Sequence, residues 1–175
     1  MRRTRKGFIY LLLTLLSLLL FPIELTMVMA NATVSFDRNM MENALVIAAQ
    51  GGSKVLDRDL VRQGVFVLNE GAATTTVKAL LQDAIGSMGS LASTTGTITI
   101  AMTNQWTSTP MQTMGVFSWQ SASFSGLSQP SSTGLSVSQF SYSTPTILLL
   151  ANVRVNDGLT TTTFHVMAHV SLVPR

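Results

Sequence analysis

Two histidines, His165 and His169, are four residues apart, a spacing that could serve a metal site. On a helix, residues four apart share one face, as helical zinc sites require. These two stand in the run TTTTFHVMAHVSLV, whose β-branched and alternating residues predict a strand instead. Four residues of strand span about 13 Å, which is too far for one shared ion. We therefore expect no metal site at the histidines.

The closely spaced acids Asp57 and Asp59 are a second arrangement that metal ions sometimes use. No further cluster of ligands accompanies them, so capping of a short helix by Asp57 explains the pair better. The chain has no cysteine, which excludes disulfides, thiolate nucleophiles and Cys-ligated zinc.

No phosphate loop, nucleophile elbow or dinucleotide fingerprint is present. Trp106 and Trp119 are the chain's two tryptophans, and they either stack on a ligand or anchor a small domain. The sequence therefore predicts a protein that is not an enzyme and has no cofactor.

The excess positive charge of the chain is concentrated at its N-terminus. There are 11 basic and 8 acidic residues, and four of the basic ones fall within the first six positions: Arg2, Arg3, Arg5 and Lys6. The remainder is close to neutral. A nucleic-acid binder needs a basic stripe on its folded part, so we expect no nucleic-acid partner.

Residues 8–29 read FIYLLLTLLSLLLFPIELTMVM and predict a transmembrane helix, because about 20 apolar residues cross a bilayer. The basic cluster before this span predicts a cytoplasmic N-terminus and an extracytoplasmic remainder. The alternative is a cleaved secretory signal, since Ala30-Asn31-Ala32 has the small-x-small form of a cleavage site. The apolar run is longer than a signal core, which favours a single-pass protein retained in the cell membrane.

Two residues inside the span are unusual. Pro22 removes one helix hydrogen bond and is expected to kink the helix without ending it. Glu24 is the only charged residue of the span. An acid in the bilayer usually has a partner, so Glu24 is a candidate assembly contact with another helix. The alternative is a protonated or snorkelling side chain near the interface.

Helical character continues beyond the span. Residues 33–50 hold no Gly or Pro, and we expect one helix over about residues 7–50, ended by Gly51-Gly52. Asp37 is assigned to the polar side of this helix. Its apolar stripe is predicted from the helical spacing of Phe36, Met40, Ala44 and Ile47, with Met41, Leu45 and Ala48 beside them.

The predicted organisation is a cytoplasmic segment (1–7), a transmembrane helix (8–29), its extracytoplasmic continuation (30–52) and an α+β domain (53–175). In the last we expect a short helix near residues 56–63, a possible strand at 65–68 and an amphipathic helix over 72–85. Strands are predicted over 97–102, 114–124, 146–155 and 162–173, with a hairpin turn at Asn156-Asp157-Gly158 and a loop over 125–136. The fold class is thus a long N-terminal transmembrane helix followed by a small antiparallel sheet with one or two packed helices.

Residues 2–50 resemble the TadE-like family of pilus-associated, pseudopilin-like membrane proteins. The resemblance lies in the basic start with RKG, the long apolar run, Ile23-Glu24-Leu25, and the small-residue stretch NALVIAAQGG. It implies a structural component of a pilus or secretion apparatus of the tight-adherence type. Its partners would be the lipid bilayer and other pilin-like subunits, contacted through the N-terminal helix.

The resemblance has one departure. Pilins carry Glu at the fifth position after the Gly where a prepilin peptidase cuts, and counting from Gly7 that position holds Leu12. Processing between Gly7 and Phe8 is therefore doubtful, and a minor or accessory role fits better than that of a major filament subunit. The alternative function is a membrane-tethered or secreted β-rich domain that binds a ligand such as a cell-wall glycan.

Overall fold

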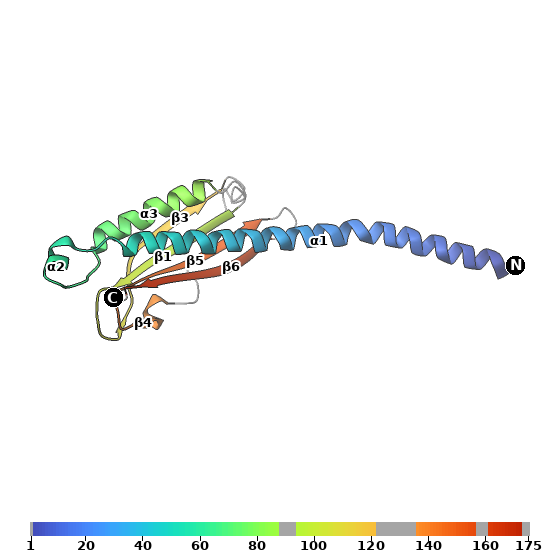
Figure 1. Ribbon diagram of the computed structural model, residues 1–175. Coiled ribbons are helices and arrows are strands. Elements are labelled where there is room, and N and C mark those ends of the chain that lie inside the picture. Colours follow the sequence, from blue (N-terminus) through green and yellow to red (C-terminus); the bar gives the residue numbers. More distant parts are fainter. Residues whose placement is uncertain (1, 88–93, 122–135, 157–160, 173–175) are drawn as a thin grey trace. The chain divides into compact units, whose positions relative to one another are not determined.

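The computed structural model describes residues 2–87, 94–121, 136–156 and 161–172, with side chains described from Tyr10 onward. The chain divides into two compact units, Met1–Phe36 and Asp37–Arg175. The first unit is helical, and the second combines helices with antiparallel strands (Figure 1). The fold class is α+β, as the sequence predicts.

Helix α1 (Arg2–Ser53) contributes to both units. The single long helix expected over residues 7–50 is confirmed and extends a few residues further at each end. Its leucine-rich first half has high helix propensity, and the helix continues through Pro22. Because Pro22 has no N–H, the carbonyl of Leu18 loses its helical partner.

The end of α1 differs from expectation, because Gly51 and Gly52 are helical and the helix ends at Ser53. The Ser53 hydroxyl donates to the carbonyl of Gln50 at 2.9 Å. A Cβ on Gly52 would lie 2.5 Å from Cγ2 of Val77, and a Cβ on Gly51 would collide with Leu80. The two glycines therefore let helices approach closely and do not stop the helix.

The packed face of α1 is rotated from the predicted stripe. Phe36 and Ile47 are 56% and 59% exposed. The buried residues of this half of the helix are Asp37, Met41, Ala44, Leu45, Ala48, Ala49, Gly52 and Ser53. The alanines let the helix backbone lie close to its neighbours, which the larger Phe36 and Ile47 would prevent. The expectation that Asp37 lies on the polar side was wrong, since its side chain is fully buried.

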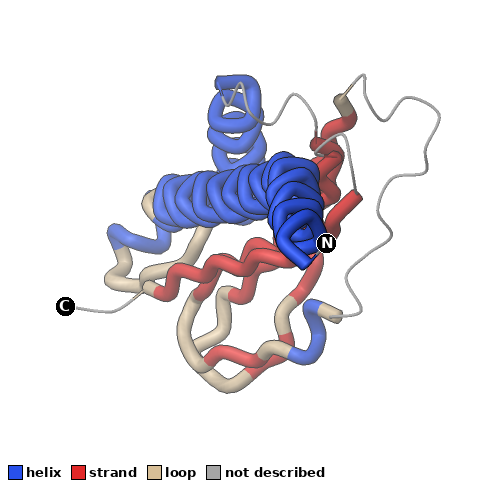
Figure 2. The backbone as a smooth tube through the Cα atoms, turned by 90° about the vertical axis from the view of Figure 1, so that its right-hand side faces the viewer, coloured by secondary structure: helices blue, strands red, loops and turns tan. Residues whose placement is uncertain are grey.

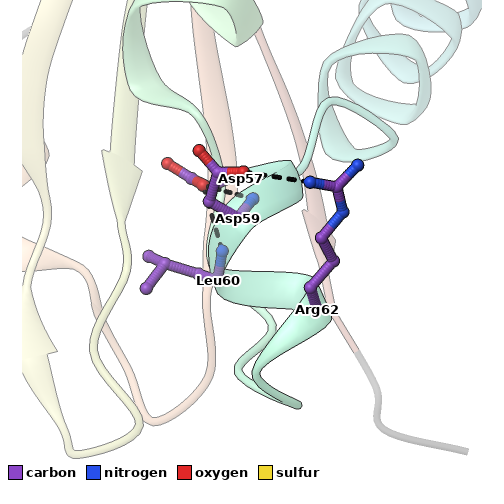
Figure 3. A network of polar contacts seen from close by, with 4 residues as sticks. All are labelled: Asp57, Asp59, Leu60 and Arg62. Carbon is purple, nitrogen blue, oxygen red and sulfur yellow. Dashed lines mark hydrogen bonds and ion pairs between the residues drawn. The ribbon is translucent and has the colours of Figure 1, made fainter.

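Helix α2 (Arg58–Arg62) is a single capped turn (Figure 3). Asp57 Oδ1 accepts hydrogen bonds from the backbone N–H groups of Asp59 at 3.0 Å and Leu60 at 3.2 Å. The predicted cap is confirmed. The strand considered for residues 65–68 is wrong, because only Leu68 pairs, in a single bridge with Leu56. Val65, Phe66 and Val67 belong to no strand, and Phe66 is 45% exposed.

Helix α3 (Glu70–Ser87) confirms the helix predicted over residues 72–85. The Asn69 side chain caps its start by accepting from the N–H of Ala72 at 3.1 Å. Ala73, Val77 and Leu81 form its buried face. These three residues are spaced by four, as the inner side of a surface helix requires.

Four strands form the main sheet in the order β3-β1-β5-β6, with every neighbouring pair antiparallel. They are β1 (Thr94–Thr103), β3 (Gln112–Gln120), β5 (Thr146–Asn156) and β6 (Thr161–Ser171). The four predicted strands are confirmed, except that Ser121 and Leu172 lie just beyond the ends of β3 and β6. Asp157 and Gly158 of the predicted turn, residues 122–124 and nearly all of the predicted loop lie outside the described residues.

A second, two-stranded sheet was not predicted. It pairs β2 (Thr109–Pro110) with β4 (Ser141–Tyr142), next to the 3₁₀ turn η3 (Val137–Gln139). Val137, Phe140 and Tyr142 pack on a buried cluster that includes Leu148 and Leu150 of β5. Strands of two residues carry too little periodicity for a sequence pattern to reveal them.

The second unit is layered, with its longer helices on one side of the strands (Figure 2). Successive strand residues point to opposite faces. Ile147 contacts the helix side, near Gly52, whereas Leu148 and Leu150 meet the small sheet. Because both faces are covered, β5 is buried along nearly its whole length.

Candidate functional site

The first unit exposes nearly all of its apolar surface. The large side chains from Tyr10 to Met29 are between 45% and 77% exposed. A soluble protein rarely exposes a contiguous apolar patch of this extent. The helix segment from Tyr10 to Ser53 contains a window of mean hydropathy 2.2 that is long and apolar enough to cross a membrane.

Three threonines in the first unit are suited to a lipid environment. The hydroxyls of Thr14, Thr26 and Thr33 donate to carbonyls of their own helix at 2.8 to 3.0 Å. In a bilayer an unsatisfied polar group costs several kcal/mol, and these bonds remove that cost.

Glu24 has no such bond. It is exposed on α1, and among the described residues it forms no ion pair, whereas Arg62 pairs with Asp59. A carboxyl group surrounded by apolar side chains needs a hydrogen-bonding partner from elsewhere. Glu24 therefore keeps its place as the candidate assembly contact.

Pro22, Gly7 and Phe8 are the other residues of α1 for which the sequence predicts a role. Pro22 lines a shallow open groove with Thr14, Ser17, Leu18 and Phe21, and the bend expected there remains a prediction. Gly7 and Phe8 lie in the helical backbone of α1. That processing between them is doubtful stays a prediction.

The histidines are on β6, as the sequence predicts, and both are exposed. His169 lies beside Tyr142, with ring centroids 5.4 Å apart. Among the residues the structure describes, no group of three His, Asp or Glu side chains could hold a metal ion. Burial raises the pKa of the Tyr142 hydroxyl above its usual value.

The two tryptophans lie near opposite ends of β1. Trp119 pairs with Gly96, covers it, and donates its Nε1–H to Thr94 Oγ1 at 3.0 Å. Trp106 follows the far end of the strand and is 42% exposed. Seven residues of strand, about 23 Å, separate Gly96 from Thr103, so one sugar ring cannot contact both tryptophans. Trp119 is an anchor of the domain, as one of the two interpretations expected.

Sequence reasoning missed Asn104, which links two distant segments. Its Oδ1 accepts from the N–H of Leu68 at 2.9 Å. Its Nδ2 donates to the carbonyl of Leu68 at 3.1 Å and to Glu70 Oε1 at 2.7 Å. These bonds fasten the start of α3 to the end of β1, beside a polar pocket of about 110 Å³ lined by Asn104, Gln105 and Gln112. No local pattern could reveal a contact across 36 residues.

Comparison with protein-family models, curated proteins and solved structures finds no match to this chain.

Proposed function

We propose that the chain is a TadE-like, pseudopilin-like or accessory component of a pilus or secretion apparatus of the tight-adherence type. It acts structurally, through its N-terminal helix, and has no catalytic role. The proposal rests on the difference between the two halves of α1. One helix exposes large apolar side chains along its first half and buries a small-residue face in the sheet domain along its second half.

This division suits a protein that holds a folded domain at a membrane while offering a helix to other subunits. The cluster Arg2, Arg3, Arg5 and Lys6 favours a cytoplasmic N-terminus, which places the sheet domain on the outer side. The helix also passes through Ala30 and Ala32 without interruption. A peptidase needs an extended segment, so the helical form supports retention of the anchor.

The test is capture of partners by the full-length protein in its native membrane. The protein is crosslinked, purified under denaturing conditions, and its adducts are identified by mass spectrometry. We expect pilin-like subunits or components of a pilus or secretion apparatus. The matched control replaces residues 8–29 with an alternating Leu-Ala helix of equal length, which keeps the anchor and removes Glu24.

The control should lose the partners while its domain remains protease-resistant. A wild-type protein that captures no apparatus component would overturn the proposal. A control that captures the same partners would show that the domain, and not the helix, makes the contact.

A further inference from the structure

The polar residues between Tyr10 and Val34 fall into two sets with different hydrogen bonding. Thr14, Thr26 and Thr33 bond to their own helix. The second set is Tyr10, Ser17, Glu24 and Asn31, all exposed. In the part of the chain whose side chains are described, no hydrogen bond is formed by these four side chains, so each needs a partner from another molecule if it lies in lipid.

These four residues are spaced by seven. Seven residues are nearly two helical turns, so residues at this spacing lie along one face of the helix and drift by only about 20° per repeat. Three positions after each of them stand Leu13, Leu20, Met27 and Val34. The arrangement matches the a and d positions of a heptad repeat, with polar residues at a and apolar residues at d. We call these eight residues the heptad seam.

We propose that the heptad seam is the surface on which α1 packs, in parallel, against α1 of a second copy of this chain. The inference rests on the proposed membrane-spanning role of α1. A seven-residue repeat favours a left-handed pair, and in lipid the polar positions hold such a pair together by hydrogen bonds between helices.

A second copy fits the chemistry of the seam better than a different helix. Hydroxyl and carboxamide groups each donate and accept hydrogen bonds, and a pair of carboxyl groups does so when one proton is shared between them. The seam contains no permanent cation, which would need an acidic partner. Two identical helices inserted in the same direction also place each residue opposite its own equivalent at the same depth.

The absence of cysteine makes this proposal directly testable, because single cysteines report contacts between copies. Ser17→Cys, Leu20→Cys and Asn31→Cys place a thiol on the seam of the full-length protein. Leu15→Cys, Leu19→Cys and Thr33→Cys place it at similar depths on the opposite face. After oxidation in membranes, we expect disulfide-linked dimers at the seam positions and several-fold less dimer at the matched controls.

A second measurement tests the polar contacts themselves, with Leu20→Cys as the reporter. Ser17→Leu and Glu24→Leu should each lower the association constant of the dimer about threefold, the typical effect of losing one hydrogen bond between membrane helices. Glu24→Gln keeps a donor and an acceptor and should retain the dimer. Ile23→Leu lies off the seam and serves as the neutral control.

Three outcomes would overturn the inference. The first is an equal yield of disulfide-linked dimer from cysteines on the seam and on the opposite face. The second is no dimer at all from protein that is inserted in the membrane, as shown by its resistance to alkaline extraction. The third is that the seam cysteines form disulfides only with a different protein. Partner capture by the cysteine-free protein is scored separately. Loss of the dimer with intact capture of apparatus components refutes the seam alone, whereas a dimer without such capture refutes the proposed function alone.

Discussion

Gly52 of α1 lies against Ile147 of β5, so closely that a Cβ on the glycine would stand 2.9 Å from Cδ1 of Ile147. Val77 of α3 approaches the same point at 2.5 Å. Helices α1 and α3 and strand β5 therefore meet at Gly52, which has no side chain. Packed interiors tolerate added methyl groups poorly, so this contact sets how near α1 can come to the sheet.

Gly52→Ala should lower the free energy of unfolding of the domain by about 1–3 kcal/mol, because the new methyl group overpacks the contact. Thermal melting of the full-length protein in detergent measures the loss. Gly86→Ala is the matched control, since it also lies in a helix but has no neighbouring atom within 4 Å. The control should be neutral or slightly stabilising, and a neutral Gly52→Ala would contradict the close approach.

The tryptophans should respond differently to truncation. Trp119→Ala removes the cover of Gly96 and the hydrogen bond to Thr94, and we expect a loss of about 2–3 kcal/mol. Trp106→Ala should change stability by less than about 0.5 kcal/mol, because that side chain is largely exposed. Equal losses from the two substitutions, measured by denaturant unfolding, would mean that Trp106 is also an anchor.

Asn104→Ala should cost about 1–3 kcal/mol, because both backbone polar groups of the buried Leu68 lose their partner. Faster hydrogen exchange at the N–H of Leu68 would locate the effect. Gln105→Ala alters the adjacent exposed side chain and should leave both stability and exchange unchanged. An unchanged exchange rate in Asn104→Ala would refute the link between β1 and α3.

The domain should lose stability in alkaline solution through Tyr142. Burial raises the pKa of its hydroxyl in the folded state above the ordinary value of 10.0. The stability linked to this group is therefore full below pH 10 and declines as the pH rises through 10 and towards the folded-state pKa. Tyr142→Phe should flatten the decline in melting temperature above pH 10. A decline of the same size in both proteins would assign it to other groups.

The mature protein should retain its anchor. Mass spectrometry of the protein from the membrane fraction is expected to find residues from the span 8–29. A mature N-terminus at Thr33 would show that the preceding residues are a signal peptide. That result would remove Glu24 and every residue of the heptad seam except Val34 from the functional protein.

The sequence by itself determined the elements of this protein that depend on local periodicity. The long helix follows from an apolar run without interruption by glycine. Helix α3 follows from apolar residues spaced by four, and the four strands of the main sheet follow from residues that alternate with a period of two. The helix cap follows from the short polar side chain of Asp57. These signals are local, because the hydrogen bonds of helices and caps join residues close together in the chain.

Only the tertiary structure decided which face of α1 is buried, what its glycines do, and where the tryptophans lie. Phe36 and Ile47 are apolar enough to be core residues, yet the close approach at Gly52 selects the face with small alanines and buries Asp37 with it. The same holds for Asn104, whose partner Leu68 lies 36 residues away in the sequence and comes near only in the folded domain. Such choices depend on which surfaces fit together at short range, and that fit arises only when distant segments of the chain have come together.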